Sequence, residues 1–109
     1  MFSVSEDFID AGKDLMSVYG REVYGERSIF KVSAGTTGTL DGDEKDTKTY
    51  VHICNPKGEG FRVSEHKDKD GIGCGVTMVA TGDDDLRNLV KALKFAVKTL
   101  EEEGLQIDD

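Results

Sequence analysis

The chain has 109 residues, a formal net charge of −8 and 33% charged residues, with one proline and two cysteines. That length suffices for one hydrophobic core and predicts a single domain over residues 1–109. The sequence contains no run of about 18 apolar residues and no signal-peptide pattern, which argues against a membrane span and against secretion. We therefore expect a soluble, cytoplasmic protein whose thiols are reduced.

Residues 1–20 are predicted to form an amphipathic helix that covers one face of a sheet. Ser3 and Glu6 have the spacing of a capping box, and Gly20 is a natural helix stop. The apolar residues that recur at helical spacing are Phe8, Ala11, Leu15 and Tyr19.

Residues 28–80 are predicted to form a four-stranded antiparallel sheet. Its first strand covers residues 28–34, and three more lie between residues 48 and 80, separated by two polar turns. The turn at residues 55–60 is expected to close a hairpin that pairs Ile53 with Val63 and places His52 opposite Ser64.

One face of this sheet would carry aromatic rings and cations. Rings stack on bases and cations neutralise phosphates, so the mixture is typical of sequence-tolerant binding of single-stranded nucleic acid. The candidate nucleic-acid-binding residues are Lys31, Lys48, Tyr50, His52, Lys57, Arg62, His66 and Lys67, with Tyr24 as a further stacking candidate.

Residues 83–103 are predicted to form a long amphipathic helix, followed by an acidic tail at residues 104–109. Thr81 or Asp83 can cap its start, and Gly104 ends it. The apolar stripe expected to face the sheet is Leu86, Leu89, Val90, Leu93, Val97 and Leu100.

Opposite this stripe, Phe95 lies beside a basic row. An exposed aromatic next to cations predicts an interface formed by Phe95, Arg87 and Lys91, although a single partly exposed ring is an equally open interpretation. The basic row consists of Arg87, Lys91, Lys94 and Lys98.

The soft metal ligands in the chain are His52, Cys54, His66 and Cys74. A zinc site is geometrically conceivable, but the spacing matches none of the paired patterns of zinc proteins. A Cys and His nucleophile pair lacks a third group and an oxyanion donor. The sequence therefore predicts no metal, no cofactor and no enzymatic activity.

Four segments occur in a suggestive order: TYVHI, KGEGFR, KDGIGCGVTM and LRNLVKALKF. This order resembles the single-stranded-DNA-binding domain of the positive cofactor four family of transcriptional coactivators, over about residues 28–100. The resemblance implies four antiparallel strands followed by a helix. It also implies a homodimer that packs through the C-terminal helices and binds single strands across its sheets.

The predicted fold class is α+β, with an N-terminal helix, a four-stranded antiparallel sheet and a long C-terminal amphipathic helix. The predicted function is non-enzymatic binding of single-stranded nucleic acid through the polar and aromatic sheet face. The alternative is a small acidic protein-interaction module, such as a phage-encoded inhibitor or nucleic-acid mimic that binds a host protein. The net charge favours this alternative, since residues 76–109 hold eight acids against four bases.

Overall fold

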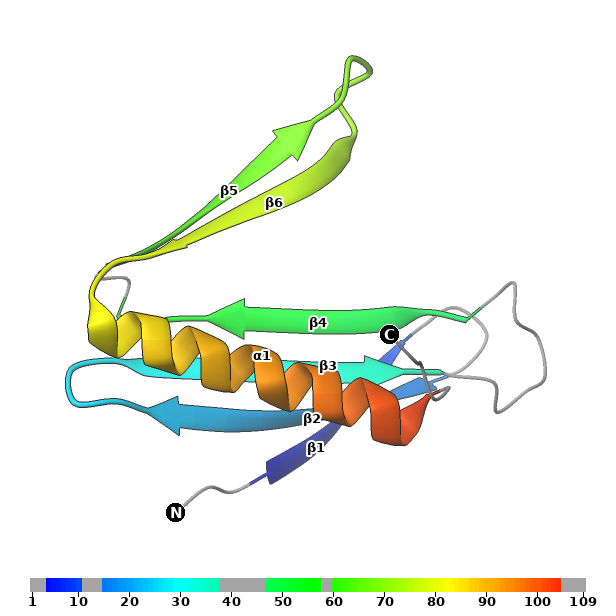
Figure 1. The fold of residues 1–109 in the computed structure, drawn as a ribbon. Helices are drawn as coiled ribbons and strands as arrows, with labels where there is room; N and C mark the ends of the chain where they lie inside the picture. Colours follow the sequence, from blue (N-terminus) through cyan, green and yellow to red (C-terminus); the bar gives the residue numbers. More distant parts are fainter. Residues whose placement is uncertain (1–3, 11–14, 38–46, 58–59, 105–109) are drawn as a thin grey trace.

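The computed structural model describes residues 4–10, 15–37, 47–57 and 60–104. These residues form the strands β1 (Val4–Asp10), β2 (Leu15–Tyr24), β3 (Ile29–Thr36), β4 (Thr49–Cys54), β5 (Phe61–Lys67) and β6 (Gly73–Ala80), and the helix α1 (Asp83–Glu103). The first four strands make an antiparallel sheet in the order β1-β2-β3-β4, and β5 pairs with β6 in a separate two-stranded sheet. Figure 1 shows α1 across one face of the larger sheet, with β5 and β6 diverging from it.

The predicted N-terminal helix is wrong, because the segment forms β1 and β2, which pair with each other. Burial in β2 has a period of two: Met16, Val18 and Gly20 are buried, whereas Ser17 and Tyr19 between them are half-buried. Apolar residues at helical spacing also fit an alternating pattern over so short a window, and pairing with β3 decides for the strand. The fold is therefore β-rich with a single helix in the described part of the chain.

The segments predicted as strands within residues 28–80 are strands, and the last two pair with each other across the predicted second turn, but the predicted pairing of Ile53 with Val63 is wrong. β4 pairs with β3, so that His52 lies opposite Ser33 and Ile53 opposite Val32. β5 leaves this sheet and pairs with β6. Phe61, at the start of β5, is buried and packs edge-on against Phe30, with ring centroids 4.9 Å apart. This anchor holds the base of the hairpin in the core while the rest turns away.

The core lies between α1 and the sheet face that α1 covers. Strands β2 and β3 contribute Val23, Phe30 and Val32, all at most 2% exposed. Ala92 and Ala96 meet them from the helix. Such small side chains let the helix approach the sheet closely, and close packing maximises dispersion contacts.

The helix is consequently rotated from the predicted orientation. Leu89 and Leu100 are partly buried against the core. The other four residues of the predicted core stripe face outward and are 55%, 40%, 41% and 57% exposed. We call these four residues the apolar flank of α1: Leu86, Val90, Leu93 and Val97.

The predicted start and end of α1 are confirmed at Asp83 and Glu103. Gly104 follows as predicted, with its N–H donating to the Leu100 carbonyl at 2.9 Å. At the start, Gly82 occupies the cap position with φ 94°, a left-handed conformation that favours glycine, and no side chain caps the helix. Within the described ranges, no helix has both the length and the apolar character that a membrane span requires.

The first turn of α1 is locked to the turn between β2 and β3. The Asp84 carboxylate accepts hydrogen bonds from the backbone N–H groups of Glu26 and Arg27, at 2.9 and 3.0 Å. One turn later, buried Asn88 donates to the Ser28 hydroxyl at 2.8 Å. These contacts join residues about 60 apart in sequence and fix where the helix crosses the sheet.

Candidate nucleic-acid interface

The predicted binding residues of β3 and β4 share one face of the four-stranded sheet. Tyr50 lies opposite Gly35, and His52 lies opposite Ser33. Lys31 lies opposite Cys54 and therefore has the same orientation. This face is the one away from α1, since the alternate residues of β3 are buried under the helix. Lys31 and His52 are exposed and Tyr50 is half-buried.

Tyr24 of β2 lies opposite Ile29 and is exposed on this same face, whereas the remaining predicted residues do not join it. Arg62, His66 and Lys67 lie on the β5–β6 hairpin, residues 61–80, which we call the arm. There His66 Nε2 and Thr77 Oγ1 are 2.7 Å apart and share a hydrogen bond. Lys48 directly precedes β4, and Lys57 lies in the turn after it. The predicted single surface is therefore divided among the sheet, the turn and the arm, because β4 and β5 are not neighbours.

The two cysteines are far apart in the topology. Cys54 is half-buried on β4, Cys74 is exposed on the arm, and both are free thiols. In the residues that the structure describes, no group of three or more His, Cys, Asp or Glu side chains is arranged to hold a metal ion.

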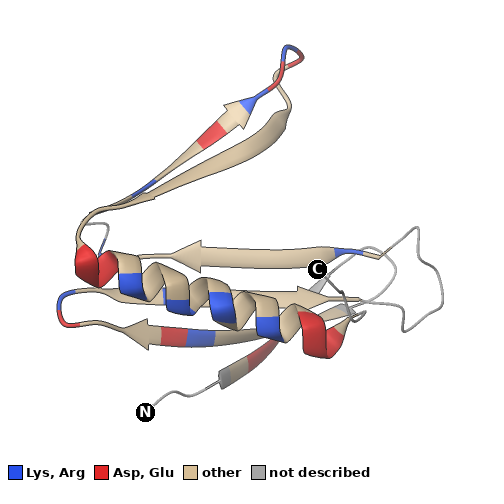
Figure 2. Cartoon of the chain, viewed as in Figure 1, with Lys and Arg blue, Asp and Glu red and all other residues tan. Residues whose placement is uncertain are grey.

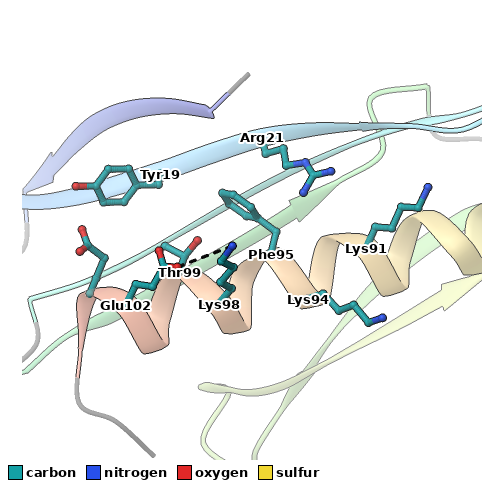
Figure 3. Close-up of a pocket in the computed structure, with 9 residues that line it drawn as sticks. Tyr19, Arg21, Lys91, Lys94, Phe95, Lys98, Thr99 and Glu102 are labelled. Carbon is teal, nitrogen blue, oxygen red and sulfur yellow. Dashed lines mark ion pairs between the residues drawn. The ribbon is translucent and has the colours of Figure 1, made fainter. Parts of the chain in front are cut away.

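A groove of about 710 Å³ lies between α1 and β2, on the side of the helix opposite the apolar flank. Figure 3 shows its walls, with side chains from β2 facing side chains from α1. It is lined by Tyr19, Arg21, Lys91, Lys94, Phe95, Lys98, Thr99, Glu102 and Glu103. Four of these nine residues are cations, although the chain as a whole is strongly acidic.

Phe95 lies in the groove beside Arg21. Its ring is half-buried and packs against the core, and the Arg21 guanidinium carbon lies 6.0 Å from the ring centroid. This separation is at the outer limit of a cation–π contact. Phe95 is therefore less exposed than its position opposite the apolar stripe led us to expect.

Three lysines of α1 form the cationic side of the groove. They recur at residues 91, 94 and 98, so their side chains follow one side of the helix, as the blue bands in Figure 2 show. Lys98 pairs with Glu102 at 4.0 Å, and both side chains are largely exposed, so this ion pair is weak. Among the described residues, Lys91 and Lys94 have no ion pair. Most of the positive charge is thus available to an anion.

Tyr19 closes the groove at its acidic end. Hydrogen bonds to the carboxylates of Glu103 and Glu6 hold the phenol protonated and raise the pKa of Tyr19 to about 12. Tyr19 thereby joins the end of α1 to β2 and β1. The groove therefore runs from a cationic stretch at Lys91 and Lys94 to an acidic end.

The sequence indicated the basic row of α1 but not its partners across the groove. Tyr19 was expected in the N-terminal helix, whereas in β2 both Tyr19 and Arg21 alternate with half-buried or buried neighbours and face α1. Reading residues 15–24 with a period of two places Tyr19, Arg21 and Val23 on one face and would have grouped them.

Comparisons of the chain with models of protein families, with curated proteins and with solved structures give no match.

Proposed function

We propose that the protein is a non-enzymatic binding protein for single-stranded nucleic acid and that the groove between α1 and β2 holds the phosphates. The observation that carries this proposal is the convergence of Arg21 with Lys91, Lys94 and Lys98 around an aromatic ring. In a chain of net charge −8, four cations on one groove make a local positive site that the overall charge would not suggest.

The groove has the two components that strand binding needs. The first and last of these lysines are seven residue steps apart, roughly 10 Å along the helix axis, which suits contact with successive phosphates of one strand. The ring of Phe95 supplies an apolar surface on which a base can stack, worth ~1 to 3 kcal/mol. Both contacts are independent of base identity, so we expect little sequence preference.

The sheet face away from α1 is a second contact surface in this proposal. Tyr50, His52 and Lys31 lie there together, but Glu22 is directly opposite Lys31 and offsets its charge. We therefore expect the groove to supply most of the affinity and the sheet face to supply less.

The fold gives less support to the alternative function, a small acidic protein-interaction module. Of the three acids in the first turn of α1, Asp85 is buried and Asp84 binds backbone N–H groups of the β2–β3 turn. Only Asp83 is exposed there, so this turn presents little free acidic surface to a basic partner. The cytoplasmic location stays a prediction.

Fluorescence anisotropy of a labelled single-stranded oligonucleotide tests the proposal. If four cations neutralise phosphates, the logarithm of the binding constant should fall with the logarithm of salt concentration with a slope of about −3. The double variant K91Q/K94Q should lower the affinity at least about tenfold at low salt and reduce the slope by about 1.4.

The matched control is R27Q/K69Q, which removes the same charge from exposed residues that lie outside the groove and were not predicted to bind nucleic acid. It should bind almost as the wild type does. Equal losses in the two double variants would mean that only net charge matters and would exclude the groove. Absence of binding by the wild type at low salt would overturn the proposed function.

A further inference from the structure

The arm is an element without a packing partner. Every residue from Arg62 to Thr77 is exposed, and only its base, with Phe61, Met78 and Ala80, contacts the core. A two-stranded hairpin is marginally stable unless one of its faces is covered. We therefore expect one face of the arm to pack against another protein surface.

One face of the arm continues the core outward. Val63 pairs with Met78, and Glu65 pairs with Val76, so these side chains lie on the same face as Phe61 and Ala80. Val63 and Val76 are 55% and 60% exposed. The arm thus presents apolar side chains that α1 and the sheet of the same chain leave uncovered.

A second uncovered surface lies on the body of the molecule. The basic residues of α1 face β2, and β3 lies beneath the helix, so the apolar flank faces the β4 side. Val51 of β4 is exposed on the sheet face that α1 covers. β4 is also an edge strand in the described part of the chain. The apolar flank, the exposed Val51 and the free edge of β4 together form a surface of the kind that proteins normally cover.

We infer that a second copy of this chain covers both surfaces, with the arm of each copy packed on the apolar flank of the other. In a two-fold symmetric dimer the arm-to-flank contact occurs twice, so this one kind of contact covers the arm and the apolar flank of both copies. The arm diverges from its own body, as Figure 1 shows, and its valines remain exposed, so these surfaces are not joined within one chain.

Area and charge both favour a second copy as the occupant. The apolar flank together with Val51, Val63, Val76 and Ile72 exposes roughly 650 Å², close to the ~800 Å² that each partner contributes to a standard interface. The arm holds three bases and three acids, so it is neutral, and the apolar flank has no charge. A neutral arm can contact an acidic copy of the same chain without strong electrostatic repulsion. A basic partner protein would find no electrostatic attraction at the neutral arm or at the uncharged flank.

This inference is separate from nucleic-acid binding, since the groove lies on the other side of α1. It also differs from the interface expected from the sequence, which placed Phe95, Arg87 and Lys91 at the contact. Sedimentation equilibrium of the full chain should give a dimer, about twice the chain mass of 11.9 kDa. A monomer at about 100 μM protein would overturn the inference.

Three variants locate the contact. L93D places a carboxylate in the apolar flank and V63D places one on the arm, and each should weaken dimerisation at least about 100-fold. Both positions are exposed in the single chain, so circular dichroism should show the helix and sheet retained. R87D changes the other side of the helix and should leave the dimer intact. If R87D lost the dimer while L93D and V63D kept it, the arm-to-flank contact would be overturned.

Mixing the two interface variants gives a sharper test. In a pair of L93D with V63D, the intact arm of L93D can dock on the intact flank of V63D, so one of the two contacts is restored. The mixture should therefore form mixed dimers at concentrations where each variant alone is monomeric. If the helices met flank to flank, or the arms met each other, mixing the two variants would restore no fully intact contact. Association of the mixture that is no stronger than that of each variant alone would therefore contradict the inference.

Discussion

Asp84 shows how one residue changes role between sequence and structure. By position, its charge complements the positive end of the α1 dipole. In the fold, its carboxylate also accepts hydrogen bonds from the backbone of the β2–β3 turn, which joins two segments far apart in sequence. The N–H groups of Arg27 and Glu26 lower the pKa of Asp84 below its ordinary value, against an opposing effect of desolvation.

Replacing Asp84 should therefore remove a pH-dependent part of the stability. A depressed carboxyl pKa stabilises the folded state above the ordinary value of 3.8, and this contribution is lost as the pH falls below it. Asp84→Ala should lower the melting temperature by roughly 5 °C at neutral pH. The difference from wild type should shrink in acid, as thermal unfolding followed by circular dichroism can measure.

Asp83→Asn is the matched control for that prediction. Asp83 is exposed, lies in the same first turn and has no hydrogen bond to the β2–β3 turn in the described structure. Its replacement should change the melting temperature little. A difference between Asp84→Ala and wild type that stayed constant down to low pH would contradict the role of the ionised carboxylate.

At the scale of an element, the rotation of α1 decides which chemistry the surface displays. The helix rests on small residues, which leaves its larger apolar side chains on one flank and its lysines on the other. Binding of a strand along the basic side and of a second copy along the apolar flank would therefore not compete for the same surface.

The close helix–sheet packing predicts a strong response to added volume at Ala92. This residue is 0% exposed, and a leucine there must displace either the helix or the side chains of β3. Ala92→Leu should lower the free energy of unfolding by about 1 to 3 kcal/mol. The same leucine at exposed Glu101 should change it by no more than about 0.5 kcal/mol. Urea denaturation of both variants compares them, and equal effects would contradict the observed helix orientation.

At the scale of the whole molecule, the arm links stability to concentration. If the arm and the apolar flank are covered only by a second copy, the folded dimer gains stability as the protein concentration rises. A hundredfold increase in concentration should raise the wild-type melting temperature by several degrees. The melting temperature of L93D should not depend on concentration. Calorimetry over that range makes the measurement, and a wild-type value independent of concentration would count against the dimer.

Features that depend on neighbouring residues could be predicted from the sequence. The bounds of α1, the strands of residues 28–80 and the basic row follow from periodicity, dipole complementarity and the glycine after the helix, which act over a few residues. The N-terminal strands were missed because helical and alternating patterns overlap in that short segment, and pairing with β3 settles the choice.

Which surfaces meet could not be predicted from the sequence, because it depends on contacts between distant segments of the chain. The sequence allowed β4 to pair with β5 across a short turn, but β3 is its partner, and strand pairing depends on contacts remote in sequence. The sequence also left open which side of α1 packs, because large apolar residues and alanines both fit an apolar face. The helix packs closely on the sheet through the side that carries the small residues Ala92 and Ala96. This orientation places Arg21 beside Phe95 and leaves the apolar flank uncovered.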